Sequence, residues 1–183
     1  MKLPLLSLLF VTAVLAQTAR DPATAGPAII AEAFGRLSGA LATAIAERGP
    51  AGALGVCSEQ APEIAREVGA AHGVQVRRAS HRPRNPKNAA DALEQAALQA
   101  FLDALAKQQA PAPQVVLNAD GSRSFLAPIV LGNPLCLQCH GDPQKDIAPE
   151  TLAAIQQRYP NDQATGFKLG DLRGLWRVTF PAP

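Results

Sequence analysis

Five consecutive residues, Cys136-Leu137-Gln138-Cys139-His140, have the types and the spacing that attach a c-type haem. The two thiols would form thioether bonds with the two vinyl groups of one porphyrin, and the imidazole that follows would bind the iron. A zinc site would need further Cys or His residues at close spacing, and a thioredoxin-like redox pair has no need of the histidine. The motif therefore predicts one covalent haem c, with His140 as an axial ligand.

The second axial ligand has few candidates in this sequence. The only methionine, Met1, is lost if an N-terminal leader is removed, so the methionine ligand of many cytochromes is excluded. The remaining candidates are Cys57, His72 and His81, with lysine or an open position behind them. Cys57 is the only cysteine outside the motif, and an unpaired thiol in an oxidising compartment is a liability unless it is buried or bound. Two interpretations stay open: an iron-bound thiolate, or a small buried apolar side chain.

A basic stretch lies just before the middle of the chain, upstream of the haem motif. Its members are Arg77, Arg78, His81, Arg82, Arg84 and Lys87. Guanidinium groups bind carboxylates well, so these residues are candidates for contact with haem propionates. We expect a solvated loop for most of the stretch, and propionate contacts for Arg78 and Arg84.

The N-terminus has the features of a secretory signal peptide. Lys2 precedes an almost wholly apolar stretch over residues 3–15, and Val14-Leu15-Ala16 forms a cleavage site. We expect a signal peptide over residues 1–16, cleavage near Ala16 and a periplasmic location, with an uncleaved anchor as the alternative. No later segment has about 18 consecutive apolar residues without charge, so we expect the mature chain to be soluble.

Composition excludes one class of partner. The formal net charge is +2 and no long run of like charges occurs, so no nucleic acid is expected as a partner. Alanine is abundant, which favours helices.

Hydrophobic periodicity predicts helices followed by a small antiparallel sheet. We expect helices over residues 27–48, 54–71, 88–109 and 149–159, and strands over residues 74–80, 114–117, 124–131 and 175–180. Asn88 is the expected cap of the third helix, and Asp120-Gly121 predicts a hairpin. This pattern predicts an α+β fold in a single domain, residues 27–183, with residues 17–26 as a flexible lead-in and the haem motif on a loop after the hairpin.

The chain also resembles the bacterial periplasmic c-type haem domains with a PAS-like fold. The resemblance runs in order through nearly all of the mature chain and rests on Val56-Cys57, Ala61-Pro62, Arg78-Ala79-Ser80, Arg84-Asn85-Pro86-Lys87-Asn88, the haem motif with Gly141, Tyr159-Pro160, Asp162-Gln163-Ala164-Thr165-Gly166-Phe167 and Gly170-Asp171-Leu172-Arg173-Gly174. It implies an antiparallel sheet flanked by helices, and it implies that Cys57 is the distal ligand. The family includes sensor modules of signalling proteins, and since this chain shows no signalling domain, we expect any sensory role to need a separate partner.

The expected function is that of an exported haem protein with a redox- or gas-sensing role. A thiolate ligand favours ferric iron and leaves more readily on reduction, after which a small gas such as CO or NO can bind. The alternatives are a periplasmic electron-transfer cytochrome and, with less support, a small haem peroxidase that uses His81 with Arg82 or Arg84; otherwise we expect no enzymatic activity. Expected partners are the haem maturation machinery, a redox or signalling protein and a second copy of the chain, paired through the N-terminal helix.

Overall fold

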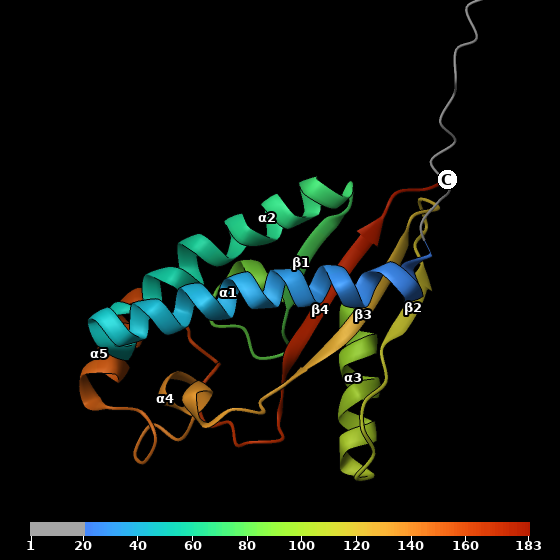
Figure 1. Cartoon of the computed structure of the whole chain (residues 1–183). Helices are drawn as coiled ribbons and strands as arrows, with labels where there is room; N and C mark the ends of the chain where they lie inside the picture. Colours follow the sequence, from blue (N-terminus) through green and yellow to red (C-terminus); the bar gives the residue numbers. More distant parts are fainter. Residues whose placement is uncertain (1–20) are drawn as a thin grey trace, which may run out of the picture.

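A four-stranded antiparallel sheet forms the centre of the computed structural model, which describes residues 21–183 (Figure 1). The strands lie side by side in the order β1-β4-β3-β2. Their bounds are β1 Gln75–Ala79, β2 Gln114–Leu117, β3 Arg123–Val130 and β4 Leu172–Phe180. β4 pairs with β1 on one side and with β3 on the other, and the predicted α+β fold with an antiparallel sheet is confirmed.

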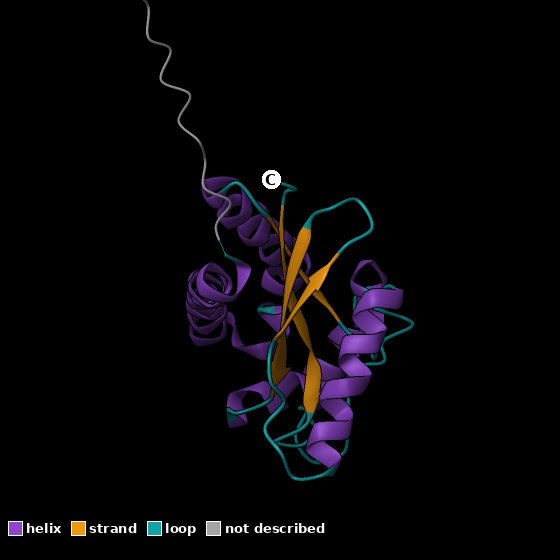
Figure 2. Cartoon of the chain, turned by 90° about the vertical axis from the view of Figure 1, so that its right-hand side faces the viewer, coloured by secondary structure: helices purple, strands orange, loops and turns teal. Residues whose placement is uncertain are grey.

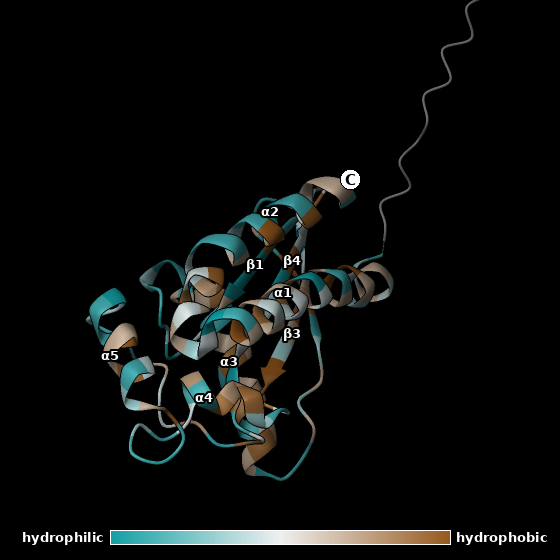
Figure 3. Cartoon of the chain, turned by 60° about the vertical axis from the view of Figure 1, so that its left-hand side comes forward, coloured by the Kyte–Doolittle hydropathy of each residue, from teal (hydrophilic) through white to brown (hydrophobic). Residues whose placement is uncertain are grey.

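Helices cover both faces of this sheet (Figure 2). The main helices are α1 Pro22–Gly52, α2 Ala61–His72, α3 Ala92–Ala106 and α5 Pro149–Arg158. Side chains of β4 alternate between the two faces: Trp176 and Val178 pack with α1 and α2, whereas Leu175 packs with α3. Hydrophilic residues cover much of the outward surface of α2 and α5 (Figure 3). The long N-terminal helix is therefore one layer of the fold.

Helix α1 begins at Pro22 rather than at Pro27, where the sequence pattern places its start. Asp21 is the N-cap, because its side chain accepts a hydrogen bond from the backbone nitrogen of Thr24 at 3.0 Å, and Pro22 fills the first turn. Residues 22–26 of the predicted lead-in are therefore helical. The predicted signal peptide, residues 1–16, and residues 17–20 lie outside the described part of the chain.

Helix α3 is capped by Asp91 and not by Asn88. The Asp91 side chain accepts a hydrogen bond from the backbone nitrogen of Glu94 at 2.8 Å, and the Glu94 side chain accepts one from the Asp91 backbone at 3.0 Å. This reciprocal pair satisfies two backbone donors at the helix start, which Asn88 does not do. Asn88 instead ends a short 3-10 turn, Pro86–Asn88.

Strand β4 begins at Leu172, three residues before the predicted start at residue 175. Gly174 makes this possible: a Cβ at that position would lie 2.3 Å from the carbonyl oxygen of Ala79 on β1. The close approach carries β1–β4 pairing to the end of the sheet that bears the haem motif.

Helix α1 is long and apolar enough to cross a membrane by length and composition alone. Core helices of soluble proteins and N-terminal signal sequences meet the same criterion. Ile29, Ala33 and Leu37 of α1 are buried against the sheet and α2, so this helix has a place in the fold. Export and the final location of the protein stay predictions.

Candidate haem site

The Cys-x-x-Cys-His motif lies at the end of the sheet where β3 ends and β4 begins (Figure 1). It is helical and not a loop: a 3-10 turn, Pro134–Cys136, runs directly into the short helix α4, Leu137–His140. The side chain of Asn133 caps the turn by accepting a hydrogen bond from the backbone nitrogen of Leu135 at 2.9 Å. The expectation of a loop is therefore corrected, and helical turns set the spacing of the two thiols and the imidazole.

The imidazole of His140 is oriented by one short hydrogen bond. Its Nδ1 lies 2.7 Å from the carbonyl oxygen of Ala164, and since a carbonyl can only accept, Nδ1 carries the proton and Nε2 keeps its lone pair. Burial lowers the pKa of His140 well below its usual range, and the charges of Arg173 and Arg84 lower it further. The hydrogen bond to Ala164 raises the pKa of His140, but it does not outweigh burial. The ring is therefore neutral at physiological pH, which is the form that binds a metal.

A buried ion pair between Arg84 and Asp162 links the motif to residues 162–164, which include the carbonyl group that binds His140. Nε and Nη2 of Arg84 each lie 3.1 Å from one carboxylate oxygen of Asp162, and both side chains are 7% exposed. Nη2 also donates to the carbonyl oxygens of Cys139 at 2.6 Å and Ala164 at 3.2 Å. The guanidinium nitrogens Nε and Nη2 of Arg84 thus already have hydrogen-bond acceptors within the protein. Through these bonds Arg84 holds the backbone of the motif in position.

Two small apolar clusters hold the two motif cysteines. Cys139 packs against a cluster formed by Leu54, Ile147 and Ile155. Cys136 packs against a second cluster, whose members are Leu131, Ala164 and Phe167. Leu54 lies three residues before Cys57 in the chain, so the segment that carries Cys57 forms part of the surroundings of Cys139.

Cys57 lies in a turn of π-helix, Val56–Gln60, between α1 and α2. Such turns are rare and frequently occur at functional sites. Burial raises the pKa of the Cys139 thiol to about 11; the Arg84 charge lowers it, and the Cys57 and Cys136 thiols raise it. The Cys57 segment thus lies near Cys139, in agreement with the packing of Leu54 and Cys139 in one apolar cluster.

Two arginines from neighbouring strands approach the same site. Burial lowers the pKa of Arg78 and lowers that of Arg173 to about 10, and in both cases a Cys57 thiolate favours the charged arginine. Arg78 lies opposite Trp176 in the β1–β4 register, and its guanidinium carbon is 5.5 Å from the centre of the Trp176 ring. Among residues 21–183, no carboxylate forms an ion pair with Arg78 or Arg173.

Of the three sequence candidates for a distal ligand, Cys57 is the one that acts on the pKa of Cys139. Nε2 of His72 lies 2.8 Å from a carboxylate oxygen of Glu32, at the far end of α2. His81 meets the ring of Phe167 edge-on at 6.4 Å between centroids, and His140 meets the same ring edge-on at 6.3 Å. His72 is thus bound to Glu32, whereas His81 and His140 share one aromatic neighbour.

Much of the basic stretch is bound to the protein rather than solvated. Arg77 pairs with buried Glu94, with 3.2 Å between Nε and Oε1. Arg82 donates to the carbonyl oxygen of Thr165, and its guanidinium carbon lies 4.1 Å from the centre of the Phe167 ring. The expectation of a solvated loop is wrong for these residues, because backbone carbonyls and a buried carboxylate supply partners that the sequence pattern does not reveal.

Asp162 and Ala164 were not predicted from the sequence as site residues, and Arg173 was not among the expected propionate contacts. Asp162 and Arg173 occur in segments that carry the family resemblance, which was the available signal. Ala164 acts through its backbone carbonyl, and a carbonyl contact with a histidine 24 positions away has no sequence signature.

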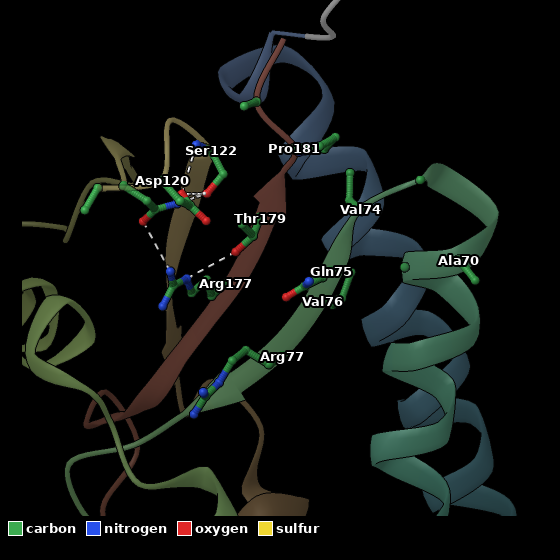
Figure 4. A pocket seen from close by; sticks show the side chains of 15 residues that line it. Ala70, Val74, Gln75, Val76, Arg77, Asp120, Ser122, Arg177, Thr179 and Pro181 are labelled. Atoms are coloured by element: carbon green, nitrogen blue, oxygen red, sulfur yellow. Dashed lines mark hydrogen bonds between the residues drawn. The ribbon is translucent and has the colours of Figure 1, made fainter.

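Two surface clefts of the described chain lie apart from the motif. The larger, about 900 Å³, lies at the opposite end of the sheet, between the start of β1 and the β2–β3 hairpin (Figure 4). Its Arg177 donates to Asn118 and Thr179 and pairs with Asp91, so its charge is matched. The smaller, about 350 Å³, is bordered by His81 and α3. No residue of the haem motif lines either cleft.

The fold and the site define an α+β protein in which a haem-attachment motif is fixed at one end of an antiparallel sheet. The chain belongs to the Tll0287-like family, whose sequence pattern (Tll0287) matches residues 10–181. The match therefore runs through every element described above.

One solved structure resembles the chain over nearly its whole length. It is the crystal structure of the cyanobacterial heme-protein Tll0287, with 28% sequence identity and a TM-score of 0.65. The alignment covers 88% of this chain and 97% of that one. No curated protein matches the chain.

Replacing Asp162 by alanine should destabilise the fold by about 3–5 kcal/mol, because it leaves the Arg84 charge buried without a counterion. Urea unfolding followed by circular dichroism measures this. Glu67→Ala, which breaks the half-exposed pair with Arg36, is the control and should cost less than about 1 kcal/mol. Equal losses in the two variants would show that the buried pair does not anchor the site.

Proposed function

We propose that this chain is an exported c-type haem protein. One haem would be joined to Cys136 and Cys139, with His140 and Cys57 as the two axial ligands of its iron. The observation that carries the proposal is the Cys-x-x-Cys-His motif, whose imidazole is oriented by Ala164 and whose Cys139 packs in one cluster with Leu54 of the segment before Cys57. The family relationship and the similarity to a cyanobacterial heme-protein support the same conclusion.

The residues present fit a covalent haem with Cys/His ligation. When bound, the haem supplies an iron that changes redox state and that can take a small gas. The chain supplies two thiols one helical turn apart, a neutral imidazole with a lone pair on Nε2, and a third thiol nearby. A buried nitrogen, Nε of Arg173, has no hydrogen-bond partner within the described residues, which suits an acidic group at this site.

A redox- or gas-sensing role follows from the chemistry of Cys57. A thiolate stabilises ferric iron, and reduction weakens its bond, so Cys57 can take a proton and leave. The π-helical turn supports such an exchange, because a π turn holds one residue more than an α turn and can rearrange locally. The antiparallel sheet between helices supports the relationship to PAS-like sensor modules. Electron transfer with both ligands retained is the second candidate.

We propose no enzymatic activity for the chain. A peroxidase would need a mobile His–Arg pair near the distal side of the iron. Arg82 and Arg84 are instead bound to backbone carbonyls, and Arg84 also to Asp162. His81 lies edge-on against the ring of Phe167.

The proposed location is the periplasm, after cleavage near Ala16. Thioether formation requires both thiols in the reduced state and a haem delivered by the maturation machinery of an exporting cell. The redox or signalling partner would meet the assembled protein in that compartment.

Haem should remain with the polypeptide after acid–acetone extraction, because thioether bonds survive this treatment. Cys136→Ala combined with Cys139→Ala should lose all extraction-resistant haem, measured as the pyridine haemochrome. Cys57→Ala is the control and should keep it. Resistant haem in the double variant would contradict covalent attachment through the motif.

Cys57→Ala should change the ferric absorption spectrum from a low-spin, six-coordinate thiolate form to another form, since one axial ligand is removed. In the sensing role, CO binds the ferrous wild type and the ferrous variant alike, because Cys57 has already left. Ferrous wild type that refuses CO while the variant binds it would favour electron transfer. An unchanged ferric spectrum in the variant would exclude Cys57 as a ligand.

A further inference from the structure

Three buried or half-buried arginines meet at the candidate site with a single carboxylate between them. Arg84 engages both oxygens of Asp162. Arg78 and Arg173 have no ion-pair partner in residues 21–183. Two guanidinium charges are thus left unmatched in a poorly solvated region, which is unfavourable unless an anion accompanies them.

The contacts of Arg173 define how it can bind an anion. Its Nη1 donates to Ser80 Oγ at 2.8 Å and to the carbonyl oxygen of Arg82 at 3.3 Å, which fixes the guanidinium plane. Its Nε is buried and has no hydrogen-bond partner. A carboxylate is the group that satisfies Nε of an arginine together with a neighbouring Nη.

Arg78 reaches the same site from the adjacent strand. Its guanidinium carbon lies 5.5 Å from the centre of the Trp176 ring, within the range of a cation–π contact. Arg173 lies over the Phe167 ring, with 5.5 Å between its guanidinium carbon and the ring centre, and His140 meets the same ring edge-on at 6.3 Å. Arg173 therefore lies near the histidine of the motif. The charge of Arg78 lowers the pKa of both Arg173 and His140.

We infer that Arg78 and Arg173 form the carboxylate-binding pair for the propionates of the haem. The inference rests on the proposed function and deepens it, because a haem has two propionates and the site has two unmatched guanidinium groups. The inference also changes the pair of propionate contacts that the sequence predicts. Arg173 takes the place of Arg84, because the nitrogens of Arg84 bind Asp162 and the motif backbone.

Resonance Raman spectroscopy of the haem-loaded protein tests the pair through the propionate bending bands, which report hydrogen bonds to the carboxylates. Arg78→Gln and Arg173→Gln should each shift a bending band and lower the midpoint potential, since a positive charge beside the haem is lost. Arg77→Gln is the matched control, because Arg77 neighbours Arg78 but pairs with Glu94. Its bending bands should be unchanged.

Lysine variants separate binding from charge and cover the case in which a glutamine variant does not fold. Arg78→Lys and Arg173→Lys keep the charge but lose the planar fork, so the bending bands should shift while the potential stays close to that of the wild type. Bending bands that match the wild type in both lysine variants, with the haem still covalently attached, would overturn the inference. Absence of covalent haem in the wild type would instead overturn the proposed function.

Discussion

The carbonyl oxygen of Ala164 is the group on which the candidate site depends. It accepts a hydrogen bond from Nδ1 of His140 at 2.7 Å and another from Nη2 of Arg84 at 3.2 Å. The backbone nitrogen of the same residue donates to Asp162 at 3.0 Å. One peptide unit thus sets the tautomer of the imidazole and holds the arginine that binds the motif. Buried polar groups need hydrogen-bond partners. The hydrogen bonds that satisfy the backbone of Ala164 therefore also orient His140, the proposed iron ligand.

The order of strands brings segments from distant parts of the chain to one end of the sheet. β4 lies between β1 and β3, so the end of β1, the end of β3 and the start of β4 are neighbours. The π-helical turn with Cys57 reaches this end from α1, and an ion pair of Glu59 with Arg158 links that turn to α5. Cys57 and His140 therefore lie on different elements, the π-helical turn and α4.

The sequence predicts the type of fold well, and the reasons are local. Helix and strand periodicity and the Asp120-Gly121 hairpin depend on neighbouring residues, and these predictions are confirmed. The Cys-x-x-Cys-His spacing is a local signal too, and the haem attachment that it indicates stays a prediction. The positions of Arg82, Arg84 and Arg173 depend on contacts across about 80 to 90 residues. Spacing along the chain does not encode such contacts. The basic stretch was therefore expected to be a solvated loop, although Arg82 and Arg84 are bound to distant parts of the chain.

Whether Cys57 and His140 bind one iron is tested most directly by iron K-edge X-ray absorption of the ferric protein. The proposed site predicts one sulfur atom in the first coordination shell, together with the nitrogens of the porphyrin and of His140. Cys57→Ala should remove the sulfur and leave the nitrogens. A first shell of nitrogen and oxygen alone in the ferric wild type, with covalent haem present, would contradict the site.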